Sequence, residues 1–109
     1  MTIDESILAG ILTRQFMRVE YIDGGGRPRV DVVEGYTLGY NRSGHKILKG
    51  FYWASFPGRW YSTGLRTYPV KQITAVELTK HKFCRPQDEV GANDSSEVAR
   101  IIGDCYFPA

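Results

Sequence analysis

The spacing of the apolar residues changes near Gln15, and this change separates a helical segment from a β structure. Before it, apolar residues recur every three or four positions, which is the spacing of one helical face. Thr2 and Glu5 have the spacing of a capping box, which satisfies free backbone donors where a helix begins. We therefore predict a helix over about residues 3–13. The residues expected to dock on the rest of the fold are Ile7, Leu8 and Ile11.

After Gln15 the apolar residues alternate with polar ones, which is typical of half-buried strands. Turn sequences such as Asp23-Gly24-Gly25-Gly26 separate these stretches. The predicted strand segments are Met17–Tyr21, Val30–Val32, Tyr36–Tyr40, Ile47–Trp53, Leu65–Val70 and Ile73–Thr79. Several short strands with closely spaced turns favour an antiparallel barrel or sandwich over alternating β and α units.

Three further local patterns carry structural predictions. Gly50 lies inside a strongly β-prone stretch and predicts a bulge or a sharp bend. Phe56–Gly64 contains Pro57-Gly58 and Thr63-Gly64, which predicts a long loop. Asp94 and Glu97 repeat the capping spacing before Val98, Ile101 and Ile102, with Gly103 as a stop, which predicts a short C-terminal helix.

The length of 109 residues is that of one domain, which we expect to cover residues 1–109. Its expected parts are the helix at 3–13, a barrel at about 15–80 and a C-terminal extension at 84–109. The hydrophobic fraction of 42% and the charged fraction of 24% argue against wholesale disorder. No apolar run approaches membrane-spanning length, and the acidic N-terminus lacks the pattern of a signal peptide. We therefore expect a cytoplasmic protein without a membrane partner, whose Cys84 and Cys105 are thiols.

The charges are distributed unevenly along the chain. Residues 39–83 hold eight basic side chains and one acidic side chain, whereas the segments on either side have an acidic excess. Aromatic residues are interleaved with these cations between Tyr40 and Tyr68. Aromatic rings stack on bases and planar ligands, and Arg and Lys bind phosphates or carboxylates, so the stretch predicts a site for an anionic ligand. The alternative is that the aromatics are core residues and the cations only solvate the surface.

We expect the cations to converge on one face beside Trp53 or Trp60. Because alternate residues of a strand face opposite ways, Lys46 and Lys49 cannot both lie on that face of a regular strand. The candidate ligand-binding residues are Arg66, Tyr68, Arg42, Lys46, Lys49, Arg59, Trp53, Trp60 and Tyr61.

Other chemistries have weaker support in the sequence. His81 and Cys84 have a spacing compatible with metal binding, but a structural zinc site usually brings two close pairs of ligands. Nothing near Cys84 or Cys105 activates a thiol nucleophile. The glycines after Asp23 lie between two strands, where a hairpin loop is favoured over a phosphate-binding loop. We therefore expect no metal, no cofactor and no catalytic residue.

The order of these segments resembles the WYL-domain superfamily over roughly residues 7–83. Val19-Glu20-Tyr21 is similar to the family's first strand, and Arg29 to Glu34 with Leu38 to its second segment. Arg66-Thr67-Tyr68-Pro69-Val70 followed by Ile73 resembles the family's Arg-x-Phe-x-Leu-x-x-Ile ending. The sequence departs from the family where Lys46-Ile47-Leu48 stands in the region of the Trp-Tyr-Leu triplet, where Gly35 replaces a proline, and where Gln72 replaces a basic residue.

The resemblance implies a short, stand-alone relative of the family with an Sm-like barrel of five antiparallel strands. It also implies a regulatory module that senses a nucleotide or nucleic acid, with Arg66 at the family's barrel arginine and Tyr68 beside it. We therefore expect a mostly β, non-catalytic module that binds a nucleotide or single-stranded nucleic acid. The alternative is a protein-interaction or assembly subunit, in which the exposed aromatic and Arg residues form an interface, including that of a homo-oligomer.

Overall fold

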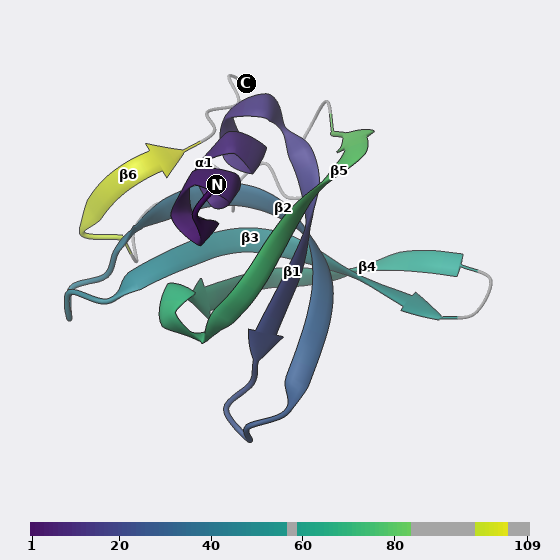
Figure 1. Ribbon diagram of the computed structural model, residues 1–109, viewed down its shortest axis with the longest axis horizontal. Helices are drawn as coiled ribbons and strands as arrows, with labels where there is room; N and C mark the ends of the chain where they lie inside the picture. Colours follow the sequence, from purple (N-terminus) through teal and green to yellow (C-terminus); the bar gives the residue numbers. More distant parts are fainter. Residues whose placement is uncertain (57–58, 84–97, 105–109) are drawn as a thin grey trace.

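The computed structural model describes residues 1–56, 59–83 and 98–104 and shows one helix on a curved antiparallel sheet (Figure 1). Helix α1 comprises Ile3–Thr13. The strands are β1 (Gln15–Ile22), β2 (Pro28–Tyr40), β3 (Lys46–Phe56), β4 (Arg59–Pro69), β5 (Ile73–Lys82) and β6 (Arg100–Asp104). A short 3₁₀ helix, η1 (Val70–Gln72), joins β4 to β5. The predicted mostly β fold with an N-terminal helix is confirmed.

The sheet is built around β2, which pairs with three other strands. The strand order is β4-β3-β2-β1-β5, and β6 adds to β2 outside this path. The first half of β2 pairs with β1, through Met17 and Val33 among others, and its last residues pair with β6, through Tyr40 and Arg100. Strands β4 and β5 are outermost, and no pairing joins them among the described residues. The sheet is therefore open in this structure, and the predicted closed barrel is not confirmed.

Helix α1 begins and docks as its sequence predicts. The Thr2 side chain accepts a hydrogen bond from the Glu5 backbone, and the Glu5 carboxylate accepts one from the Thr2 backbone, both at 3.1 Å. Ile7 and Ile11 are fully buried against the sheet. Leu8 packs on Gly103 of β6, where a Cβ would collide with it. Among the described residues, no helix is long and apolar enough to cross a membrane.

The buried residues lie on both faces of the sheet: α1 covers the face of Met17 and Leu48, whereas Phe51, three residues after Leu48 on β3, faces the other way. Tyr36 and Phe83 lie within a cluster that also includes the edge-to-face pairs Phe16–Phe83 and Tyr21–Tyr68. The buried core residues are Ile7, Ile11, Met17, Val19, Tyr21, Val33, Tyr36, Leu38, Leu48, Phe51, Tyr68, Ile73 and Phe83.

The predicted loop over Phe56–Gly64 is wrong, because β3 runs to Phe56 and β4 begins at Arg59. The two strands pair from Phe56 and Arg59 inwards, so cross-strand hydrogen bonds override the turn-forming character of the sequence. Gly64, with φ of 153°, lies beside a register shift between Tyr52 and Trp53. The glycine therefore marks an irregularity within a hairpin and not the end of a strand.

The predicted C-terminal helix is also wrong where the structure describes it. Arg100–Asp104 forms strand β6, which pairs with β2 from Thr37 to Tyr40. A pair of isoleucines fits either a helix face or a strand, and the free edge of β2 decides between them. The proposed capping residues Asp94 and Glu97 lie outside the described residues.

The bulge expected at Gly50 lies directly opposite it, on β2. Gly50 pairs regularly with Gly35 and Arg66, and the register shifts fall between Gly35 and Thr37 and between Tyr52 and Trp53. A Cβ at Gly50 would lie 2.5 Å from the backbone oxygen of Glu34. Glycine is needed there because β2 and β3 approach closely, and the bulge that bends β2 lies on the partner strand.

The burial of α1 predicts how much its apolar stripe contributes to stability. Replacing Ile11 with Ala should lower the free energy of unfolding by about 2–5 kcal/mol, because it leaves a cavity at a fully buried position. Leu12→Ala is the matched control, because Leu12 is 65% exposed and its loss should cost less than about 0.5 kcal/mol. Urea unfolding of both variants checks this, and similar losses would show that α1 is not docked as described.

Candidate functional site

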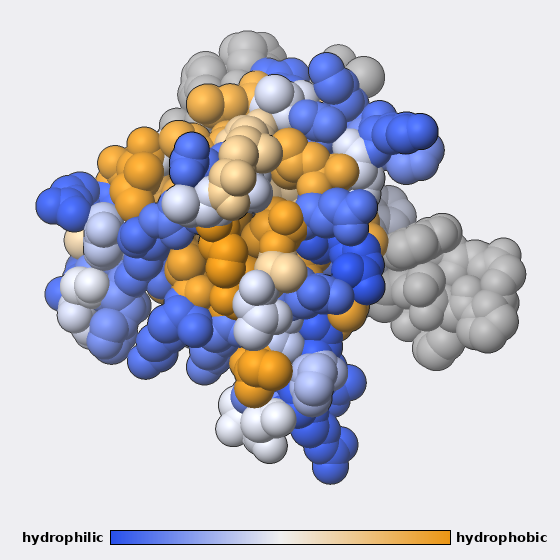
Figure 2. Space-filling model, in the orientation of Figure 1, coloured by the Kyte–Doolittle hydropathy of each residue, from blue (hydrophilic) through white to orange (hydrophobic). Residues whose placement is uncertain are grey.

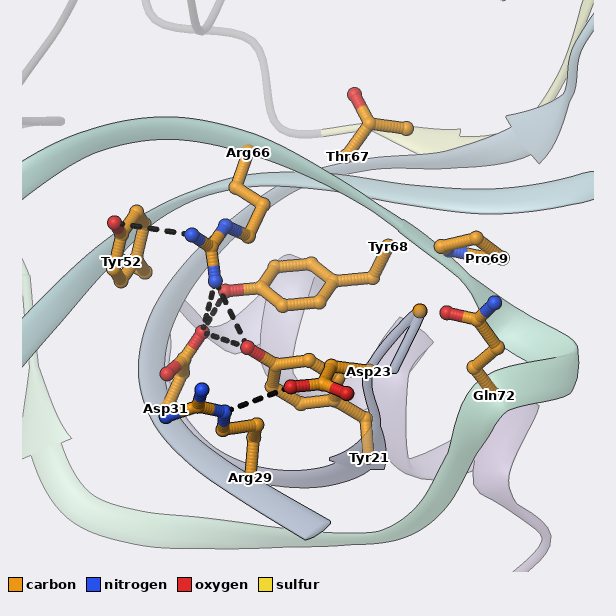
Figure 3. Close-up of a pocket in the computed structure, with 11 residues that line it drawn as sticks. Tyr21, Asp23, Arg29, Asp31, Tyr52, Arg66, Thr67, Tyr68, Pro69 and Gln72 are labelled. Atoms are coloured by element: carbon orange, nitrogen blue, oxygen red, sulfur yellow. Dashed lines mark hydrogen bonds and ion pairs between the residues drawn. The ribbon is translucent and has the colours of Figure 1, made fainter. Parts of the chain in front are cut away.

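A pocket of about 540 Å³ opens between the β1–β2 hairpin and the end of β4 (Figure 3). Its walls are polar and aromatic, and they come from four strands, the β1–β2 loop and η1. The residues that line it are Tyr21, Asp23, Gly24, Arg29, Asp31, Tyr52, Arg66, Thr67, Tyr68, Pro69 and Gln72. The volume lies within the range of small-ligand sites in proteins.

The carboxylate of Asp31 is the centre of the pocket's hydrogen bonds. Its Oδ2 accepts bonds from the hydroxyl of Tyr68 at 2.7 Å, from the hydroxyl of Tyr21 at 3.1 Å and from Nη1 of Arg66 at 3.3 Å. The Asp31 side chain is only 14% exposed, so these donors replace much of its hydration. Three residues from β1 and β4 are therefore tied to one oxygen on β2.

The guanidinium of Arg66 is fixed from two sides. Nη1 donates to the Tyr21 hydroxyl at 2.8 Å as well as to Asp31, and Nη2 donates to the Tyr52 hydroxyl at 3.1 Å. The guanidinium also lies over the Tyr52 ring, 4.0 Å from its centroid. A guanidinium carries five N–H donors, so two of them have no partner within the described part of the chain. With 40% of its side chain exposed, Arg66 can present these donors to a ligand.

A second Asp–Arg pair forms the opposite lip of the pocket, at the β1–β2 loop. Nε of Arg29 donates to Oδ2 of Asp23 at 2.9 Å. The other Asp23 oxygen accepts bonds from the backbone N–H groups of Gly25 and Arg27, which lower the pKa of Asp23 together with Arg29. Asp23 thus closes the β1–β2 loop through hydrogen bonds and holds Arg29 at the pocket.

The surroundings of the phenols keep them protonated. Burial, followed by the hydrogen bond to Asp31, raises the pKa of Tyr68 far above that of a free tyrosine. Burial and the charge of Asp31 also raise the pKa of Tyr21. Burial alone would lower the pKa of Arg66, but the neighbouring phenols and Asp31 outweigh it and raise that pKa. The pocket therefore contains a permanent cation held by a carboxylate and neutral hydroxyls.

The register of the β1–β2 hairpin brings these residues together. Tyr21 pairs with Arg29 and Val19 with Asp31, so Asp31 shares the concave face with the buried Val19. The alternation of valines around Asp31 predicts the strand correctly but does not give its phase, and Val30 is exposed. Counting residue pairs outwards from the hairpin loop would have placed Asp31 opposite Val19 and therefore on the inner face.

The structure brings Arg66 and Tyr68 of the predicted set into this pocket, and it leaves Arg42, Lys46, Lys49 and Trp53 outside the described lining. Arg42 is exposed in the β2–β3 turn. Lys46 lies at the start of β3, where it forms an ion pair with Asp4 of α1 and where this hydrogen bond raises the pKa of Lys46. The predicted convergence of cations is therefore limited, and the pocket contains residues that sequence reasoning missed. These are Tyr21, Asp23, Arg29, Asp31 and Tyr52.

Lys49 and Trp53 lie on the opposite face of β3 from Tyr52, as strand alternation requires. Lys49 is buried between Thr37 and Thr67, its partners in the neighbouring strands. Trp53 packs edge-on against Phe16, and its Nε1 donates to the buried Glu34 at 3.2 Å. The side chains of the remaining candidates lie outside the described part of the structure. They are Arg59, Trp60 and Tyr61.

Comparisons with known proteins give no relative from which a function could be taken. No protein-family model, no curated protein and no solved structure matches the chain. Within the described ranges, no group of three or more His, Cys, Asp or Glu side chains could hold a metal ion. Cys84 and Cys105, which the metal and thiol alternatives require, lie outside those ranges.

The phenols make stability depend on alkaline pH. The folded-state pKa of Tyr68 is raised above its unfolded value of about 10, so its contribution is complete below pH 10 and is lost as pH rises further. Unfolding free energy should therefore fall above about pH 10, by up to about 1.4 kcal/mol per pH unit for each such phenol. Tyr68→Phe should make that fall shallower, as measured by urea unfolding between about pH 8 and pH 11. Equal slopes for the two proteins would contradict the assignment.

Proposed function

We propose that this protein is a non-catalytic binding module whose pocket takes a nucleotide, with the phosphate at Arg66. The observation that supports this best is the fixed guanidinium of Arg66. Tyr21, Tyr52 and Asp31 hold it, and two of its N–H donors have no partner among the described residues. Such a planar fork suits phosphate, and its fixed position reduces the entropy lost on binding.

The charge balance of the pocket supports a small polar ligand. Arg66 pairs with Asp31, and Arg29 pairs with Asp23, so each cation that faces the ligand has its own carboxylate. The pocket thus offers donors and acceptors at close range without a large excess of one charge. A nucleotide has this mixed chemistry, with an anionic phosphate and a base that carries both donors and acceptors.

The same residues support binding over catalysis. The raised pKa values of Tyr21 and Tyr68 make both phenols poor general bases at neutral pH. The carboxylate of Asp31 is already engaged by three donors. Each polar group of this cluster thus orients its neighbours, which is the property of a preorganised binding site.

We also propose that the protein is related to the WYL-domain superfamily, that its sheet closes into a small barrel and that it is cytoplasmic. The element order supports the kinship, since a helix precedes five antiparallel strands and β6 lies beyond them. The position of Arg66 supports it as well, because the residue that resembles the family's barrel arginine lines the pocket. The regulatory role that this family implies would then depend on ligand binding in the pocket.

Substitution of Arg66 tests the proposed site. Arg66→Met should weaken the binding of nucleoside monophosphates by about tenfold or more, because it removes charge-assisted hydrogen bonds. Arg18→Met is a matched control, since Arg18 is 45% exposed and also pairs with a single carboxylate, that of Glu20. Isothermal titration with each of the four ribonucleoside monophosphates measures both effects, and inorganic phosphate shows how much of the affinity the phosphate supplies.

Two results of this titration would contradict the proposal. One is the absence of binding by the wild-type protein, and the other is an equal loss of affinity in the Arg66 and Arg18 variants. Because Arg66→Met leaves Asp31 without its cation, circular dichroism of the variant is needed to show that it folds. Arg66→Lys keeps the charge and removes the planar fork, so it should bind with intermediate affinity.

Assembly with other chains is the second candidate function, and the open sheet favours it. The outer edges of β4 and β5 are unpaired among the described residues, and such edges can add a strand from another molecule. We expect an assembly formed in this way to strengthen with protein concentration and to change little with salt, whereas phosphate binding weakens with salt. Sedimentation at rising protein and salt concentrations separates the two functions.

A further inference from the structure

Strand β6 occupies one part of the edge of β2, and its contacts there form a small binding site for an extended chain. Strand β1 pairs with the first half of that edge, and β6 pairs with its last residues, from Thr37 to Tyr40. The contact begins before the strand, because the backbone N–H of Ala99 donates to the carbonyl oxygen of Tyr40 at 2.8 Å. We call residues 98–104 the docked segment and residues 37–40 of β2 the docking edge.

Two glycines allow the docked segment to approach β2 and α1 closely. A Cβ at Gly39 of the docking edge would collide with the backbone oxygen of Arg100 and with the side chain of Val98. A Cβ at Gly103 of the docked segment would collide with the side chain of Leu8 on α1. A larger residue at either glycine would push the segment away, so the fit is specific to these surfaces.

The docked segment is held by its own residues and not by the chain that leads to it. The Arg100 guanidinium lies 4.3 Å from the centroid of the Tyr40 ring, which adds a side-chain contact to the backbone pairing. Strand β5, which precedes the segment, lies at an outer edge of the sheet, with β1 between it and β2. Fourteen residues, 84–97, lead to the segment, and a chain of that length spans up to about 50 Å. The docking edge of a second copy therefore lies within its reach.

The two isoleucines of the docked segment remain exposed. Ile101 and Ile102 are 46% and 42% exposed, and no other isoleucine among the described residues is exposed. Figure 2 shows hydrophobic side chains gathered where β6 lies beside α1. Apolar side chains that cluster on a surface mark contacts with other chains. A single copy thus pairs the backbone of this segment but leaves apolar surface that a second copy can cover.

We propose that two copies of this chain exchange their docked segments, so that each segment lies on the docking edge of the other copy. The exchanged dimer keeps the contacts of the single chain and brings a second copy next to the isoleucines. A second copy suits the edge better than an unrelated peptide, because the glycines and the Arg100–Tyr40 contact match within this one sequence. The inference uses neither the nucleotide pocket nor the outer edges of β4 and β5.

Disulfide capture between two variants tests this exchange. Leu8→Cys and Gly103→Cys place thiols on the two sides of one contact, in a background in which Cys84 and Cys105 are replaced by Ser. When the two variants are mixed and oxidised, a disulfide between chains should form, because only an exchanged segment brings these thiols together. Electrophoresis without reductant should then show a covalent dimer with one chain of each variant.

The matched control moves the thiol on α1 and keeps the change in the docked segment. Thr13 is exposed at the end of α1, five residues and about 7.5 Å beyond Leu8. Thr13→Cys mixed with Gly103→Cys should therefore give little covalent dimer, since random collision is its only source. A single chain that carries both Leu8→Cys and Gly103→Cys should form the disulfide readily, and its failure to do so would overturn the docking that the inference requires.

The wild-type protein gives a second measurement. In sedimentation, the ratio of dimer to monomer should rise in proportion to the monomer concentration between about 10 µM and about 1 mM. The inference is overturned if the protein stays monomeric over this range, or if the Leu8 and Thr13 mixtures give equal amounts of covalent dimer. A dimer that sediments but gives no disulfide between the Leu8 and Gly103 variants also overturns it, because assembly then uses another surface.

Discussion

The rest of the molecule depends on strand β2, because its backbone hydrogen bonds connect it to three other strands. Its thirteen residues pair with β3 along one edge and with β1 and then β6 along the other. One strand can serve two partners on the same edge because it bends at the register shift between Gly35 and Thr37. The bend also curves the sheet around α1, where Gly35 leaves room for Met17 and Ile11. The concave core and the pocket at its margin both follow from this bend.

The residues that shape the pocket also contribute to the stability of the fold. Asp31 lies on the core face of β2, where an unpaired carboxylate would be costly, so Arg66 and two phenols must satisfy it. These same bonds hold the Arg66 guanidinium over Tyr52 with donors left over among the described residues. Structural and binding roles therefore coincide in one network, and a change that frees Arg66 also leaves a buried charge without its partner.

The sequence was sufficient for the helix cap and the period of the strands, and insufficient where pairing between strands decides the structure. The capping pair Thr2 and Glu5 and the period-two stretches predicted α1 and the positions of the strands. The strand that replaced the loop after Phe56 and the strand formed by Arg100–Asp104 instead depend on pairing with β3 and β2. For the site, Arg66 and Tyr68 were found from their sequence pattern, whereas Asp31 was missed because local alternation does not determine which face of a strand turns inwards.

An arginine lies over a tyrosine ring twice among the described residues, and the surroundings give the two contacts different consequences. Over Tyr52, Arg66 is also held by Asp31, so its donors point in a fixed direction and can select the geometry of a ligand. Over Tyr40, Arg100 has the ring but no carboxylate within the described ranges, so it retains a larger share of its charge for solvent and anions. A fixed, neutralised cation contributes orientation, and a less constrained one contributes long-range attraction that salt screens.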